Sequence, residues 1–132
     1  MALYLDTSAL VKLVIAEKES EELRQFVGHR GVVSSQITQT ELVRAVNRVE
    51  PDRVEAAEEL LEDLIFLAVD RLLAIRAGWV RPATVRSLDA VHIATAVAMQ
   101  GDLEAMVTYD ARMIEAAGMA GLPVASPGGA AA

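Results

Sequence analysis

Short apolar segments typical of buried strands alternate with helical segments along almost the whole chain. This alternation predicts an α/β fold, because strands joined through helices pair in parallel and need helices over both faces of the sheet. We expect a three-layer α/β/α sandwich around a short, mostly parallel central sheet. The expected strands are residues 3–5, 31–34, 65–69, 105–108 and 122–125, and the expected helices are residues 8–17, 19–27, 38–49, 52–63, 72–80, 89–100 and 111–117.

Length and composition limit what this fold can be. A chain of 132 residues fits one domain, which we place at residues 1–126, with residues 127–132 as a flexible tail. A hydrophobic content of 53% excludes disorder, and the longest apolar stretches are too short to span a membrane. Residues 1–16 lack an early positive region and carry Asp6 and Lys12, unlike a secretory signal. Cysteine is absent, which excludes disulfides and thiolate zinc sites. We expect a soluble, cytoplasmic protein.

Four acidic residues occupy positions where a carboxylate needs a positive partner. Asp6 and Asp110 follow two apolar strands, at the end where parallel sheets place their chemistry. Glu41 and Asp89 lie near the start of apolar helices. Four carboxylates in one pocket repel each other, and a hard divalent cation such as Mg²⁺ or Mn²⁺ removes that repulsion. The pattern predicts a divalent-metal site.

Each acid also has an ordinary structural explanation. Asp6 and Asp110 stand where they would cap the following helices. Glu41 is three residues from Arg44, the spacing of a surface ion pair. Asp89 would complement the dipole of its helix, although that helix is apolar around most of its circumference, so its start is expected to be buried.

Neighbouring polar residues have weaker signals. His92, three residues after Asp89, fits best as a core histidine that braces Asp89. Ser8 and Thr108 each lie two residues from a proposed ligand, where a hydroxyl supports the site or caps a turn. The single Trp79 does not make a stacking platform for nucleic acid by itself.

The net charge of −7 is unusual for a protein that acts on nucleic acid, since phosphate binding normally requires a basic surface. The acids are concentrated, however. Residues 17–22 and 50–63 hold 11 of the 19 acidic residues, and only Lys18 and Arg53 among the bases. The rest of the chain carries 8 acids and 10 bases, although those acids include the four proposed ligands. Such acidic stretches are typical of solvated helix faces.

Four motifs in this order resemble the PIN domain family, specifically the bacterial toxin ribonucleases of VapC type. They are YLDTSAL from residue 4, TELVRA from residue 40, LDAVHIATA from residue 88 and VTYDARM from residue 107. The resemblance covers nearly the whole chain, and the four motifs together are far more specific than any one acid. It implies a Mg²⁺- or Mn²⁺-dependent endoribonuclease that cuts structured or single-stranded RNA and is the toxin of a type II toxin-antitoxin pair. It also implies a cognate antitoxin protein that blocks the site, and a homodimer.

The resemblance also assigns residues. Asp6, Glu41, Asp89 and Asp110 match the family's catalytic, metal-binding acids, and Ser8 and Thr108 match supporting hydroxyls. Arg44 and Arg112 stand where bases would contact RNA phosphates, with looser matches. In the mechanism this implies, one metal held mainly by Asp6 and Asp110 activates water and a second stabilises the leaving oxygen.

Two other functions remain as alternatives. One is a noncatalytic, dimeric partner-binding module with the same fold. The other is a receiver-like phosphoacceptor domain, which fits poorly because such domains need paired acids after the first strand and a Lys after the last. This chain has a single Asp6 and no Lys beyond Lys18.

Overall fold

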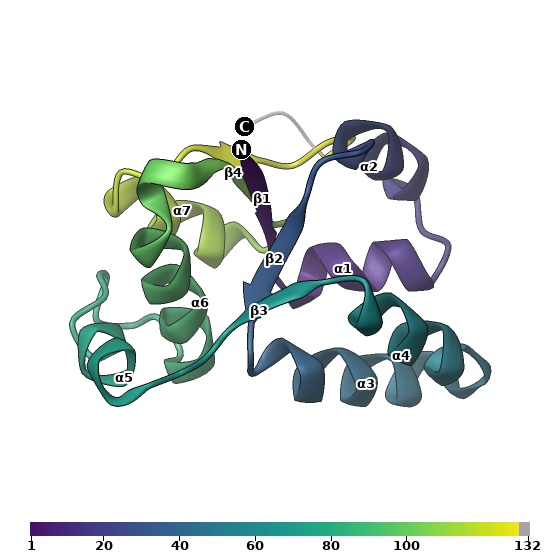
Figure 1. Ribbon diagram of the computed structural model, residues 1–132, viewed down its shortest axis with the longest axis horizontal. Coiled ribbons are helices and arrows are strands. Elements are labelled where there is room, and N and C mark those ends of the chain that lie inside the picture. Colours follow the sequence, from purple (N-terminus) through teal and green to yellow (C-terminus); the bar gives the residue numbers. More distant parts are fainter. Residues whose placement is uncertain (130–132) are drawn as a thin grey trace.

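The computed structural model describes residues 1–129 and contains one five-stranded sheet (Figure 1). The strand order is β3-β2-β1-β4-β5, and every neighbouring pair is parallel. The strands are β1 (Ala2–Leu5), β2 (Val32–Ser35), β3 (Ile65–Leu67), β4 (Leu103–Val107) and β5 (Val124–Ala125). The predicted sandwich with a short parallel sheet is confirmed.

Helices cover both faces of the sheet, four on one side and three on the other (Figure 1). The first group is α1 (Thr7–Val14), α2 (Ser20–Val27), α3 (Thr38–Val49) and α4 (Val54–Glu62), with a 3₁₀ turn, η1 (Pro51–Arg53), before α4. The second group is α5 (Arg71–Ala77), α6 (Ser87–Ala98) and α7 (Ala111–Met119), with η2 (Gln100–Asp102) between α6 and β4.

The alternation of side chains along β1 explains the two layers. Leu3 and Leu5 are fully buried against α1 to α4, whereas Tyr4, between them, is fully buried against α6 and α7. Successive strand residues point to opposite faces, so a strand buried on both sides is apolar at every position. In the second layer α5 packs on the outside of α6, where Leu73 meets Ala90 and Ala94.

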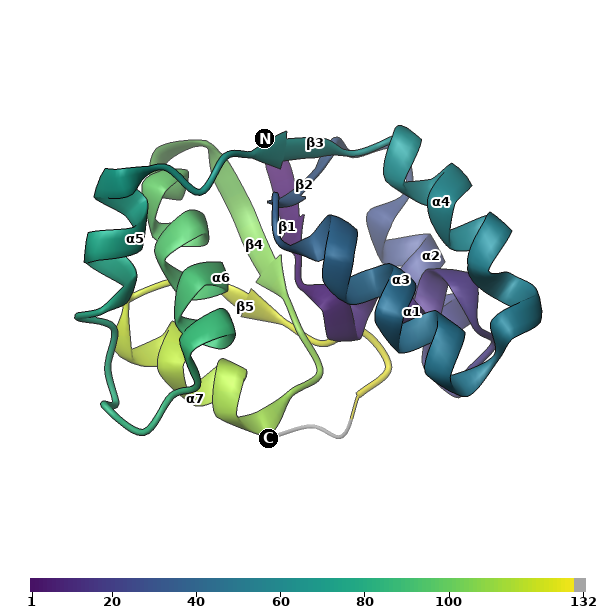
Figure 2. The same cartoon turned by 90° about the horizontal axis from the view of Figure 1, so that it is seen from below.

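The central position of β1 determines where a site can form. Within the sheet, β2 lies next to β1 on one side and β4 lies next to β1 on the other. The strand order therefore reverses beside β1. Ligands of open parallel sheets bind at such a switch point, outside the carboxyl ends of the strands. At this end α6 and α7 lie on one side of the sheet and α1 and α3 on the other (Figure 2).

Most boundaries agree with the sequence expectation within a few residues, and α3 matches its predicted range, residues 38–49.

No helix in residues 1–129 is both long enough and apolar enough to cross a bilayer. Within the predicted tail, residues 130–132 lie outside the described residues, and the Pro127 carbonyl accepts a hydrogen bond from Tyr109 Oη at 2.7 Å.

Candidate active site

Asp6 follows the central strand β1 and is only 2% exposed. Its Oδ1 accepts hydrogen bonds from Ser8 Oγ at 2.6 Å and from the Ala9 amide at 3.0 Å, which caps α1. Its Oδ2 accepts a hydrogen bond from Thr108 Oγ1 at 2.6 Å. Burial raises the pKa of Asp6, against the opposing effect of the Ser8 and Thr108 hydrogen bonds. The predicted capping role is therefore present, and the carboxylate is also held by two hydroxyls.

Thr108 and Ser8 connect Asp6 to the turn that carries Asp110. Leu5 pairs with Val107 in the sheet, so the residues that follow the two strands are neighbours. Thr108 Oγ1 accepts a hydrogen bond from the Asp110 amide at 3.2 Å, and Ser8 Oγ accepts one from the Tyr109 amide at 3.0 Å. The exposed Asp110 caps α7 through the Arg112 amide at 2.9 Å. Both supporting hydroxyls predicted from sequence lie in the site.

Glu41, in the first turn of α3, reaches the same end of the sheet. Its Oε1 accepts hydrogen bonds from Thr7 Oγ1 at 2.8 Å and from His92 Nε2 at 2.6 Å. Burial raises the pKa of Glu41, but the His92 and Thr7 contacts outweigh it and leave that pKa below its ordinary value. Both hydrogen bonds fall on Oε1, so Oε2 can accept a further ligand. The ion pair with Arg44 that the sequence allowed does not form within residues 1–129. Glu41 makes this partly buried contact with His92 instead, and Arg44 lies exposed on α3.

His92 is the main residue whose role the sequence did not reveal. It is 1% exposed, and its ring joins Glu41 to Tyr4, whose Oη lies 2.5 Å from His92 Nδ1. A carboxylate only accepts, so Nε2 carries the hydrogen toward Glu41. Burial raises the pKa of Tyr4, so its hydroxyl stays protonated and donates to Nδ1. His92 is thus a core histidine, as expected, but it positions Glu41 rather than bracing Asp89.

Asp89, in the first turn of α6, is partly buried and has a raised pKa. Burial is the main cause, followed by the negative charge of Asp110, and the charge of Glu41 acts in the same direction. Asp89 therefore lies in the electrostatic field of both acids. Together with the contacts of Asp6, this places all four predicted acids at the carboxyl end of the sheet.

The four acids do not form a closed metal-binding cluster as the side chains stand. Within residues 1–129, no group of three or more His, Cys, Asp or Glu side chains is gathered closely enough to hold a metal ion. Their chemistry nevertheless fits a hard divalent cation, because every member of the set offers carboxylate oxygens and no sulfur ligand is present. Two of them, Asp6 and Asp89, have pKa values raised by burial, a cost that a nearby cation offsets.

A family model decides which fold family this architecture represents. The PIN domain model matches residues 3–119 of the chain. This chain belongs to the PIN domain family. The matched range contains all four acids and both supporting hydroxyls.

Curated relatives resemble the chain over nearly its full length. Ribonuclease VapC47 of Mycobacterium tuberculosis (strain CDC 1551 / Oshkosh) is 39% identical over 132 residues, covering 96% of this chain and 97% of the relative. Ribonuclease VapC46 of Mycobacterium tuberculosis (strain ATCC 25618 / H37Rv) is 39% identical over 127 residues, covering 96% of this chain and 98% of the relative.

Solved structures share the PIN fold at lower sequence identity. Mycobacterium tuberculosis VapC20, a toxin that cleaves the sarcin-ricin loop, superposes with a TM-score of 0.72 at 16% identity, covering 87% of this chain and 95% of that one. A toxin-antitoxin complex from Klebsiella pneumoniae contains a chain with a TM-score of 0.71 at 22% identity, covering 96% of this chain and 98% of that one.

Proposed function

We propose that this PIN domain is a metal-dependent endoribonuclease and the toxin of a type II toxin-antitoxin pair. The observation that supports the proposal is the location of four carboxylates, from four separate segments, at the carboxyl end of the sheet. The 39% identity to Ribonuclease VapC47 supports RNA as the substrate. Asp6 also caps α1, but an uncharged residue such as Asn would cap the helix without the cost of a buried charge, so a noncatalytic module does not require an acid there.

We propose Asp6, Glu41, Asp89 and Asp110 as the residues that hold Mg²⁺ or Mn²⁺. When bound, such a cation supplies Lewis-acid activation of water and stabilises negative charge at the phosphate being cleaved. The specific ion is part of the proposal, and the carboxylate donor set supports Mg²⁺ or Mn²⁺ over softer metals.

The chain's own residues orient these ligands. Ser8 and Thr108 hold both oxygens of Asp6, and His92 and Thr7 hold Oε1 of Glu41. Carboxylates that are already held in place lose less conformational entropy when they bind a cation, so less reorganisation is needed during the reaction. Exposed Asp110 and partly buried Asp89 mark the side from which a phosphodiester reaches the site.

An antitoxin protein is the proposed partner. A chain of the toxin-antitoxin complex from Klebsiella pneumoniae is similar to this one, which supports a protein partner. That the antitoxin blocks the site is part of the proposal. The expected homodimer and the cytoplasmic location are also proposals, to be checked by light scattering and by fractionation.

Cleavage with a defined chemistry tests the proposal. Purified wild-type protein with Mg²⁺ or Mn²⁺ should cut RNA and leave 5′-phosphate and 3′-hydroxyl ends, and co-expression with the neighbouring gene product should suppress the cutting. Asp6→Asn should nearly abolish it, whereas Asp102→Asn, on the exposed η2 turn, should not. An Asp6→Asn protein that cuts RNA at the wild-type rate would refute the assignment.

A further inference from the structure

Residues 71–88 form the one long stretch of basic character in an acidic chain. They contain four arginines, Arg71, Arg76, Arg81 and Arg86, and no Asp or Glu, while the whole chain carries a net charge of −7. This stretch comprises α5, the connection to α6 and the first residues of α6. We call it the arginine segment.

All four arginines of the segment are exposed, and none forms an ion pair with any residue in 1–129. The contrast with Arg24 and Arg30 is clear, because those arginines pair with Glu21 and Glu104. A row of guanidinium groups without carboxylate partners creates a local positive potential, which attracts phosphate. Although the net charge is negative, the surface of the arginine segment is therefore suited to binding a polyanion.

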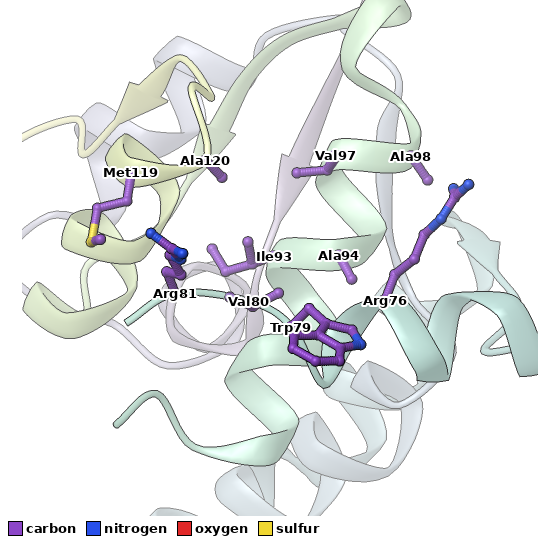
Figure 3. Close-up of a pocket in the computed structure, with 10 residues that line it drawn as sticks. All are labelled: Arg76, Trp79, Val80, Arg81, Ile93, Ala94, Val97, Ala98, Met119 and Ala120. Atoms are coloured by element: carbon purple, nitrogen blue, oxygen red, sulfur yellow. The ribbon is translucent and has the colours of Figure 1, made fainter. Parts of the chain in front are cut away.

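Trp79 lies within this surface with its ring in solvent. It is 83% exposed, an unusual state for the largest apolar side chain of a soluble domain. It borders a cavity of about 420 Å³ that is also lined by Arg76, Arg81, Val97 and Met119. In Figure 3 the two arginines lie on opposite sides of the indole. A nucleobase can stack on such an exposed aromatic ring while the arginines on either side contact its phosphates.

The position of the cavity relates it to the acidic site. Four residues of α6 line the cavity, namely Ile93, Ala94, Val97 and Ala98, and Asp89 lies in the first turn of the same helix. Four to nine residues of helix separate them, a rise of about 6–14 Å. Arg86 is the residue directly before α6 and lies three positions before Asp89, so it continues the basic surface toward the site. The arginine segment thus extends from the cavity to the acids.

We propose that the arginine segment binds the single-stranded RNA that flanks the cleavage point, with the guanidinium groups on phosphates and Trp79 stacked on one base. This inference rests on the proposed ribonuclease function and assigns the RNA-binding surface of the same site. A second copy of the chain is a competing occupant, because exposed Leu72 and Ile75 lie on the same segment, but four arginines without carboxylate partners favour a polyanion. An antitoxin segment on the same face is the competing outcome of the test below.

The fluorescence of Trp79 gives a direct measurement, since it is the only tryptophan. Asp6→Asn protein with Mg²⁺ should bind RNA without cutting it, so that the complex persists during the measurement. Short oligoadenosine should quench and shift the Trp79 emission, whereas an abasic strand of the same length should bind more weakly and leave the emission unchanged. RNA that binds without altering the emission would overturn the role of Trp79.

Matched variants test the arginines. In the Asp6→Asn background, Arg76→Ala/Arg81→Ala should weaken oligoadenosine binding, and the slope of log K against log salt should fall by about 1.4, for two lost phosphate contacts. Trp79→Ala should weaken binding about tenfold, the loss expected for one unstacked base. Arg48→Ala, an exposed arginine on α3, should leave binding unchanged.

The outcomes separate this inference from the proposed function. If wild-type protein cuts no RNA with either metal, the ribonuclease proposal fails. If wild-type protein cuts RNA and the Arg76→Ala/Arg81→Ala and Trp79→Ala variants cut and bind it equally well, only the present inference fails. A Trp79 emission that responds to the antitoxin or to protein dilution, and not to RNA, assigns the surface to a protein partner and overturns it as well.

Discussion

Asp6 illustrates the conflict between stability and function at the level of one residue. Burial raises its folded-state pKa above the ordinary 3.8, so between these two values the folded protein holds a proton that the unfolded chain has released. The free energy of unfolding therefore falls as pH rises through that window, and it stays lower above it. The fold tolerates this cost at the point where the chemistry needs a carboxylate.

Replacing Asp6 by Asn should reverse that cost. Asn keeps the amino cap, because its Oδ1 still accepts from the Ala9 amide, but it carries no charge. Without added metal at neutral pH, Asp6→Asn should melt a few degrees higher than wild type, and the difference should shrink as pH falls toward 3.8. Thermal unfolding followed by circular dichroism measures it.

Asp70→Asn is the matched control for this prediction. Asp70 also caps a helix, accepting from the Leu73 amide at 2.9 Å, but it is exposed. Its replacement should leave the melting temperature nearly unchanged. If Asp6→Asn melted lower than wild type at neutral pH, the buried charge would not be the dominant effect.

His92 should be required for the geometry of Glu41. His92→Leu leaves the Tyr4 hydroxyl without its partner and Glu41 Oε1 with Thr7 alone, at a cost of about 2–4 kcal/mol in unfolding free energy. RNA cleavage should then need more Mg²⁺, because Glu41 is no longer held. Tyr4→Phe removes only the outer hydrogen bond, so it should cost about 1–2 kcal/mol and change the Mg²⁺ requirement less. The same Mg²⁺ dependence in His92→Leu and wild type would mean that His92 only packs.

The residue types at the site were predictable, but their partners were not. Strand ends and helix starts pointed to Asp6, Asp110, Glu41 and Asp89, since each sits at a position defined by local sequence. The His92 contact with Glu41 joins residues 51 positions apart, and only the packing of α6 near α3 creates it. Local spacing favoured Asp89, three positions away, as the partner of His92.

Among the helices, α6 shows what periodicity can and cannot reveal. Its apolar residues run around most of its circumference because it is covered on two sides, by the sheet and by α5. The expectation of a buried start was wrong, since Ser87 and Leu88 are exposed and Asp89 is only partly buried. It begins at Ser87 and ends at Ala98 rather than spanning residues 89–100, because η2 takes over at Gln100. Helix α1 ends earlier than expected, at Val14, and Ile15 is already extended.

The small residues of α6 allow its close approach to the sheet. Ala96 is fully buried in the cluster that contains Met106 and Ile93. Ala96→Leu should overfill this space and lower the unfolding free energy by about 1–3 kcal/mol. Ala98→Leu, on the exposed side of the same helix, should change it by less than about 0.5 kcal/mol. Chemical denaturation of both variants compares them, and equal stabilities would show that α6 packs loosely.

At the scale of the whole molecule, the fold places acidic and basic segments on different faces of the sheet, whereas the net charge gives only their sum. The acidic stretches 17–22 and 50–63 fall in and around α2 and α4, over one face of the sheet, while the arginine segment belongs to the layer on the other face. Composition alone therefore does not show how charge is distributed over the surface. Sequence located the acidic stretches, but the relation of the arginine segment to Trp79 and the cavity required the tertiary structure.

Metal binding should stabilise the whole domain through the four acids. A ligand that binds only the folded state adds about 2.7 kcal/mol when its concentration is one hundred times its dissociation constant. Mg²⁺ or Mn²⁺ should therefore raise the melting temperature of the wild-type protein in a concentration-dependent way, independently of any RNA. Asp89→Asn should remove most of this increase, since Asp89 lies in the field of Asp110 and Glu41.

Asp102→Asn controls for the loss of one negative charge. Asp102 is exposed on η2, directly before β4, whereas the four acids lie beyond the carboxyl ends of the strands. Its variant should keep the full metal-dependent increase, because a distant exposed charge is screened by salt. An equal increase in wild type, Asp89→Asn and Asp102→Asn would place the bound metal elsewhere, since stabilisation by a cation held at the four acids must depend on which carboxylate is removed.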